Sequence, residues 1–271
     1  MSHIVWPERA TEEAAAYFKA TRRILDLFHL IIDSVISNDF VAYTAKKALD
    51  QVDSENGEKI FERGPDDKVV SKITPADLAQ SNPGPRTKAL RQSAQELLEL
   101  FLARSVDSFE TYIVSIIRAV LRKQPRILSD SKHDLDIKTI LDHSSIDSLV
   151  YDLAERKVSG LSYSGFEDLQ SWCNTHGIAL TVPAGKRDEV IELIATRNVI
   201  AHNRGVIDQK YLGIVKAPRF KADERRTLHS YELFTAIGLL CQIIEAAHGA
   251  VASKFGLEML PLEGLDQTQQ C

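Results

Sequence analysis

Three polar residues on one predicted helix have side chains suited to phosphate chemistry: Arg197, Asn198 and His202. They lie in the stretch from Asp188 to Leu212, where apolar residues recur at helical spacing. Arg197 falls on the line of the apolar stripe, where the pattern predicts a leucine. A charged side chain that faces an interior persists only if it is paired or lines a polar cleft. This departure from the helical pattern therefore predicts a functional site near the end of the helix.

RNA cleavage without a metal ion is the chemistry that these side chains suit. The imidazole of His202 can take a proton from a 2′-hydroxyl group or give one to the leaving 5′-oxygen. The guanidinium of Arg197 can bind two oxygens of a phosphorane-like transition state. Asn198 lies one turn before His202, where it can hydrogen-bond the imidazole or hold the phosphate directly. The expected products carry a 2′,3′-cyclic phosphate and a 5′-hydroxyl group.

The sequence RNVIAHNRGVIDQKYL, from Arg197 to Leu212, resembles the HEPN superfamily, and within it domains of the RiboL-PSP-HEPN type. The family motif is an arginine, a polar residue after it, and a histidine four to six residues beyond the arginine. Arg197, Asn198 and His202 match that motif. The resemblance extends over about Lys88 to Gly256. It implies catalytic roles for the three motif residues in an endoribonuclease, within a helical bundle.

The same resemblance implies partners. HEPN-type domains commonly form homodimers in which two motifs face one cleft. This bears on the site, because Arg197 and His202 point about 140° apart on a continuous helix and are difficult to focus on one phosphate. The family also implies a toxin or an anti-phage defence effector, with RNA as substrate and an antitoxin or another protein as partner. HEPN-like folds serve as non-catalytic dimeric binding or scaffold modules too, so this alternative function stays open.

Glu110 is a further candidate, because the first core helix of HEPN-type domains often carries a glutamate. The segment SVDSFETYIVSII, which contains Glu110, resembles that helix. A surface glutamate or a local ion pair explains Glu110 equally well.

A basic segment follows the motif, from Arg204 to Arg226. It holds seven basic residues against three acidic ones, a local net charge of +4. If this segment lines a cleft, its side chains can contact an RNA backbone, although a solvated loop has the same composition. The candidate RNA-binding residues are Arg204, Lys210, Lys216 and Arg219.

Composition excludes several other functions. The net charge of −5 argues against a molecule that binds nucleic acid over its whole surface. The histidines lack metal-ligand spacing and no nucleotide-binding or serine-hydrolase motif is present, so we expect neither a metal nor a cofactor. We expect no apolar run of membrane-spanning length and no signal peptide, which predicts a cytoplasmic protein with reduced cysteines.

Helical periodicity dominates the chain and predicts an all-α fold. The long elements are expected at Glu8 to about Ile36, Thr87 to Lys123, and Asp223 to about Phe255, with shorter helices between them. The polar pair Asn38–Asp39 either breaks the first helix or only kinks it. The expected organisation is an N-terminal helical segment (1–52), a charged linker or insertion with a small hairpin (53–86), a HEPN-like domain (87–256) and a tail (257–271).

Overall fold

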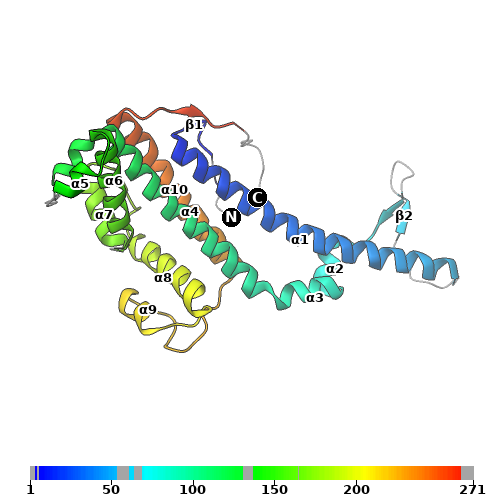
Figure 1. Ribbon diagram of the computed structural model, residues 1–271. Coiled ribbons are helices and arrows are strands. Elements are labelled where there is room, and N and C mark those ends of the chain that lie inside the picture. The colour runs from blue at the N-terminus through cyan, green and yellow to red at the C-terminus, as the bar shows by residue number, and fades with distance from the viewer. Residues whose placement is uncertain are drawn as a thin grey trace. The chain divides into compact units, whose positions relative to one another are not determined.

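The computed structural model confirms the all-α fold class (Figure 1). It describes residues 4, 6–53, 61–63, 69–130, 137–163 and 165–263. Strand within these ranges is confined to two short antiparallel pairs and one isolated bridge. The strands are β1 (Arg9–Ala10) paired with β4 (Leu260–Pro261), and β2 (Phe61–Arg63) paired with β3 (Val69–Ser71).

The described helices have the following bounds: α1 Glu12–Asp53, α2 Pro75–Ser81, α3 Pro85–Gln92, α4 Ala94–Lys123, α5 Ile137–Leu141, α6 Ile146–Tyr163, α7 Phe166–Thr175, α8 Arg187–Asn203, α9 Gln209–Ile214 and α10 Ser230–Phe255. A 3₁₀ turn, Pro125–Asp130, follows α4. The chain divides into two compact units, Met1–Arg23 with Glu99–Cys271, and Ile24–Leu98. These boundaries fall inside α1 and α4, so they differ from the predicted boundaries at 53 and 87.

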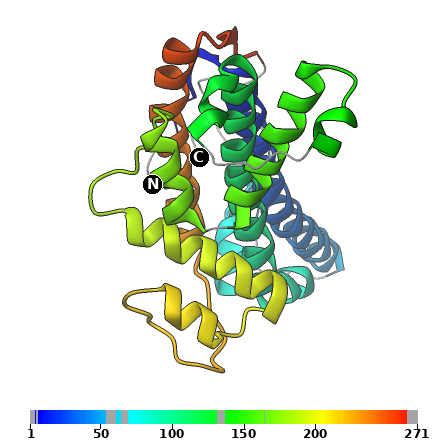
Figure 2. The ribbon, with the colours of Figure 1, turned by 60° about the vertical axis from the view of Figure 1, so that its left-hand side comes forward.

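The core of the first unit forms where the first turns of α1 meet α4 and α10 (Figures 1 and 2). Phe18 of α1 is buried and makes an edge contact with the ring of His248 on α10. Tyr17 contacts Cys241 of α10 and the ring of Tyr112 on α4. Each of these helices carries a near-continuous apolar stripe, and together they bury what a lone helix would expose. The β1–β4 pair then joins the two ends of this unit.

The motif helix α8 crosses the long helices of this unit, with α9 on its outer side (Figure 2). A small apolar cluster holds α9 against α8. Its buried members are Ala195, Val199, Ile207, Tyr211 and Val215. Asp208 begins α9, because its carboxylate accepts the backbone N–H of Tyr211.

The second unit is built on the remainder of α1 and includes the predicted hairpin. The β2–β3 register pairs Glu62 with Val70, which confirms that hairpin, while its turn lies outside the described residues. The helix α1 continues through Asn38–Asp39 without a break. Asp39 is buried instead, and its carboxylate accepts the backbone N–H groups of Thr87, at 2.7 Å, and Arg86, at 3.3 Å.

The structure corrects three expected helix boundaries. The predicted helix from Thr87 to Lys123 is two helices, α3 and α4, separated at Ser93. The first helix, expected from Glu8 to about Ile36, runs from Glu12 to Asp53. The last helix begins at Ser230, because Asp223 has a left-handed backbone (φ 67°) and its segment pairs with Val206 to Ile207 instead of capping a helix.

The helix α10 also differs from expectation. Among the described residues it is the one helix long and apolar enough to cross a membrane, although no run of that kind was expected. Just over half of its apolar window, 56%, is buried inside the protein, as in the core helix of a globular fold. The cysteines within the described ranges, Cys173 and Cys241, are free thiols and buried, and Cys271 lies outside those ranges.

Candidate functional site

Arg197 is held by two carboxylates of α4. Its Nε donates to Asp107 at 2.5 Å, and its Nη2 lies 3.1 Å from a carboxylate oxygen of Glu110. About a quarter of the Arg197 side chain, 27%, stays exposed. The charge on the apolar stripe is therefore paired, as burial requires, and the pairing joins α8 to α4.

Asn198 contacts the arginine rather than the histidine of the motif. Its Oδ1 accepts a hydrogen bond from Nη1 of Arg197 at 2.8 Å. The guanidinium thus donates to Asp107 and Asn198 and forms an ion pair with Glu110. This leaves the amide N–H₂ of Asn198 as a donor toward a ligand.

Arg197 and Asn198 line a cavity of about 1090 Å³ between α4, α7, α8 and α9. Asp107, Glu110 and Lys210 line it as well, so the cavity has both acidic and basic walls. Apolar side chains such as Ile194 and Phe166 form other parts of the wall. Its volume is at the upper end of those of small-molecule sites and would hold more than one nucleotide.

The electrostatics of this wall are set by Glu110. Burial raises the pKa of its carboxyl above the ordinary value, the charge of Arg197 lowers it, and Asp107 raises it again, with a net increase. Arg197 therefore opposes the protonation of Glu110 that burial favours.

His202 lies outside this arrangement. Its side chain is exposed, it is not part of the cavity wall, and within the described ranges it makes no hydrogen bond to Arg197 or Asn198. The helix ends after Asn203, with left-handed backbone at Arg204 (φ 53°) and Gly205 (φ 76°). This end does not turn His202 toward the cavity, so one chain does not focus the imidazole and the guanidinium on one point.

Two features of the helix end favour a glycine at residue 205. Its backbone is left-handed, and a Cβ atom there would lie 2.9 Å from the Glu99 carboxylate. Arg225 pairs with the same carboxylate at 3.1 Å. The loop after the motif is thereby fixed against α4.

The basic segment is largely neutralised within the chain. Lys216 pairs with Asp188 at 2.7 Å, and Arg219 pairs with Glu232 at 2.8 Å. Arg226 is buried and contacts the same Glu232. Of the four predicted RNA-binding residues, Lys216 and Arg219 are therefore partners of carboxylates. Arg204 and Lys210 are exposed, and Lys210 is the one on the cavity wall.

Asp107 is the site residue that sequence reasoning missed. A signal was present, because Asp107 and Glu110 are spaced i, i+3 and so share one face of a helix. An arginine on an apolar stripe needs such a partner. Which of the many carboxylates would supply it could not be read locally, since Asp107 and Arg197 are 90 residues apart.

No protein-family model matches the chain, and neither a curated protein nor a solved structure matches it.

Proposed function

We propose that the chain is a HEPN-like endoribonuclease that cleaves RNA without a metal ion. The observation that supports this most is the set of contacts around Arg197. The motif residues Arg197 and Asn198 line a cavity of nucleotide size or larger, and Arg197 pairs with Glu110. Glu110 is the residue that matches the glutamate often found in the first core helix of HEPN-type domains.

In this proposal the 2′-hydroxyl oxygen attacks the adjacent phosphorus while the bond from phosphorus to the 5′-oxygen breaks. The products are a 2′,3′-cyclic phosphate and a 5′-hydroxyl end. Arg197 and the Asn198 amide stabilise the charge that develops on the phosphoryl oxygens. An imidazole accepts the proton from the 2′-hydroxyl or supplies one to the leaving oxygen. DNA, which lacks the 2′-hydroxyl group, should survive.

A two-fold dimer would complete the site. Within one chain His202 is exposed and away from the cavity that Arg197 lines. A second copy related by two-fold symmetry can bring its own His202 toward that cavity. By the same symmetry, His202 of the first chain then lies toward the cavity of the second. The site of the active form would then combine side chains from both chains.

A non-catalytic scaffold or binding module is the second candidate, and one observation favours it. The guanidinium of Arg197 already donates to Asp107 and Asn198 and pairs with Glu110 within the chain. With these partners, the structural role of joining α8 to α4 is enough to explain the arginine. A phosphate would have to compete with two carboxylates for it.

RNA cleavage in EDTA separates the two functions. Purified protein is incubated with mixed single-stranded RNA and DNA substrates in excess chelator, and the product ends are analysed. We expect RNA fragments with 2′,3′-cyclic phosphate ends and intact DNA. His202→Ala and Arg197→Ala should each lower the cleavage rate by at least about 100-fold, the size expected when an acid–base group or a charge-stabilising donor is removed.

Two matched variants serve as controls. His29→Ala changes a histidine in the other unit, and Arg187→Ala changes an arginine in the first turn of the same helix, where it pairs with Glu167. Both should cleave at the wild-type rate. RNA that stays intact with wild-type protein, or His202→Ala with unchanged activity, would favour the scaffold.

The biological setting follows from the resemblance alone. We propose a cytoplasmic toxin or anti-phage effector, restrained by an antitoxin or another protein partner. No cofactor or metal enters the proposed reaction, because the motif supplies both the proton-transfer group and the positive charge.

A further inference from the structure

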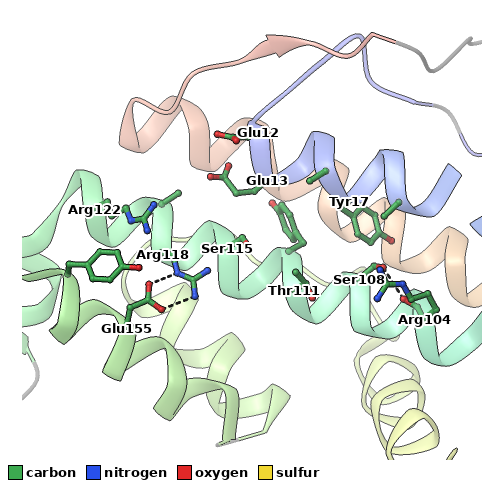
Figure 3. Close-up of a pocket in the computed structure, with 15 residues that line it drawn as sticks. Glu12, Glu13, Tyr17, Arg104, Ser108, Thr111, Ser115, Arg118, Arg122 and Glu155 are labelled. Carbon is green, nitrogen blue, oxygen red and sulfur yellow. Dashed lines mark hydrogen bonds and ion pairs between the residues drawn. The ribbon is translucent and has the colours of Figure 1, made fainter. Parts of the chain in front are cut away.

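A second cavity, of about 580 Å³, lies between the start of α1, α4 and α6 (Figure 3). All of its lining residues belong to the first unit. One wall is a polar stripe of α4, whose members recur at helical spacing: Arg104, Ser108, Thr111, Ser115, Arg118 and Arg122. Figure 3 shows Glu13 projecting from α1 toward the part of this wall that carries Arg118 and Arg122.

The cavity contains a buried hydroxyl group that lacks a partner. Tyr112 is 2% exposed and lines the cavity, and its hydroxyl group has no hydrogen bond among the described residues. Buried hydroxyl groups in folded proteins almost always have a partner. Burial, and then the charge of Glu13, raises the pKa of Tyr112 well above its ordinary value, so the hydroxyl keeps its proton and can donate. A polar ligand would supply the missing acceptor.

One end of the cavity suits a phosphate beside an aromatic ring. Arg118 binds Glu155 through Nε at 2.5 Å and Nη2 at 2.9 Å, which leaves its other N–H groups for a ligand. The guanidinium of Arg122 lies 5.2 Å from the ring centre of Tyr151. Tyr151 is 51% exposed, so one face of its ring can stack on a base.

The opposite wall, on α1, suits a ligand group that carries two neighbouring hydrogen-bond donors. Glu13 is half-buried, and within the described part of the chain its carboxylate makes no hydrogen bond or ion pair. Acidic residues are common in the first turn of a helix, where the backbone N–H groups favour them. That preference explains why residues 12 and 13 are acidic, but it does not explain why they line a cavity.

The charges of the cavity limit its ligand. Three arginines and three glutamates line it, so the lining carries no net charge at neutral pH. The arginines Arg118 and Arg122 and the carboxylate of Glu13 come from different helices. A lining with both signs of charge favours a ligand with one anionic group and one donor-rich edge, and it disfavours a triphosphate.

We propose that this cavity binds a guanine nucleotide through a single phosphate, with the base edge on Glu13 and the phosphate on Arg118 and Arg122. Guanine presents adjacent N1–H and N2–H₂ donors, which a carboxylate can accept side by side. Adenine, cytosine and uracil each place an acceptor next to their donor, which a carboxylate repels. The volume is within the range of small-molecule sites.

The same chemistry can come from a free mononucleotide or from a guanine within an RNA strand. Neither source requires that the protein cleave RNA, so this inference and the proposed function can fail separately.

Titration calorimetry on the full chain tests the site with GMP, AMP, CMP and UMP. A second series uses 2′-O-methyl trinucleotides with a central guanine or adenine, which cannot be cleaved by attack of a 2′-hydroxyl. We expect the guanine ligand to bind at least about tenfold more tightly than its adenine counterpart. A preference seen with GMP identifies a free nucleotide as sufficient, and one seen only with the trinucleotide identifies a guanine within a strand.

Glu13→Gln should remove the guanine preference, because the amide replaces one acceptor with a donor. Arg122→Ala should weaken every ligand by a similar factor. The matched controls Glu258→Gln and Arg126→Ala change exposed residues of the same unit outside the cavity and should bind as wild type. Equal affinities for all bases, no binding in either series, or a guanine preference that survives in Glu13→Gln would overturn the proposal.

Discussion

Arg197 has two roles that the sequence pattern does not separate. It is the arginine of the motif, and it is also the counter-charge of Asp107 and Glu110. The second role is structural and gives the arginine a measurable contribution to stability. Sequence alone left the sign of that contribution open, because relief of desolvation opposes the loss of partners. With two half-exposed carboxylates facing it, the loss of partners should dominate.

We expect Arg197→Ala to lower the free energy of unfolding by about 1–2 kcal/mol at pH 7, discounted for the partial exposure of all three groups. The loss should be smaller near pH 4. The pKa of Glu110 is already raised in the folded state, and removal of Arg197 raises it further, so the folded variant takes up a proton more readily than the unfolded chain. Stability of the variant therefore falls as pH rises through that pKa.

Urea unfolding at the two pH values measures the difference. Arg187→Ala, which loses one exposed pair with Glu167, should change by less than about 0.5 kcal/mol at both. An equal loss for Arg197→Ala at pH 4 and pH 7 would mean that Glu110 does not depend on the arginine.

His248 provides a second test at the residue scale. It is 4% exposed, its Nδ1 has no partner among the described residues, and burial lowers its pKa. As pH falls, His248 therefore binds a proton in the unfolded chain before it does so in the folded chain. The contribution of neutral His248 to the free energy of unfolding is fully present above the ordinary histidine pKa. It declines as pH falls below that pKa, by at most about 1.4 kcal/mol per pH unit for one proton.

Replacement by an apolar side chain of similar volume should remove this dependence. We expect His248→Leu to show a flatter free energy of unfolding between pH 7 and pH 5 than wild type. The comparison uses thermal or urea unfolding across that range. A slope identical to that of wild type would show that other groups control stability there.

At the scale of elements, α3 is capped by a side chain from another helix. Its N-cap residue, Gly84, has no side chain to accept the N–H groups of the first turn, and Asp39 of α1 accepts them instead. A Cβ atom at residue 84 would lie 2.4 Å from the Asp39 carboxyl carbon, so the glycine permits the approach. Burial raises the pKa of Asp39, but the N–H groups of Thr87 and Arg86 lower it by more.

Asp39→Ala should therefore destabilise the second unit by about 1 kcal/mol, the usual cost of a lost N-terminal cap. The backbone N–H of Thr87 should also exchange with solvent faster. Hydrogen exchange at that residue is the direct measurement. Asp33→Ala, an exposed residue on the same helix, is the matched control. Unchanged exchange at Thr87 would show that α3 does not depend on this cap.

The long helix α4 lines both the motif cavity and the cavity at the start of α1. Asp107 and Glu110 face the motif cavity, while Arg104 and Arg122 line the second one. Thr111, Ser115 and Arg118 line both. Because these residues lie within a few turns of one rigid helix, a ligand in one cavity lies close to the wall of the other.

At the scale of the whole molecule, the proposed reaction requires two chains. Within one chain His202 is exposed and away from the cavity that Arg197 lines, and the proposed two-fold dimer would bring the partner's histidine toward that cavity. We expect the protein to elute as a dimer, and cleavage per chain to fall on dilution below the dimer dissociation constant. Light scattering and a dilution series of the cleavage rate measure both.

Mixing inactive variants gives a sharper result. If the site is shared, a mixture of His202→Ala and Arg197→Ala chains should regain part of the activity, because a mixed dimer retains one intact pair. The two variants alone serve as controls. Full specific activity in a monomer, or no recovery on mixing, would place the whole site within one chain.

Much of the fold could be predicted from the sequence, because its information is local. Apolar residues at helical spacing predicted the motif helix α8 and the C-terminal ends of α4 and α10, and turn residues predicted the β2–β3 hairpin. The position of Arg197 on an apolar stripe also identified a residue that must be paired. Each of these depends on neighbours within one or two turns of the chain.

Only the tertiary structure decided which groups meet. Asp107 rather than His202 lies beside the motif arginine, Asp39 caps α3 instead of breaking α1, and Glu232 neutralises part of the basic segment. A helix pattern specifies which face is apolar but not which distant carboxylate packs against an arginine on it. Those pairings follow from how the helices pack, since burying a charge or a helix end without a partner costs more free energy than one cap or ion pair contributes.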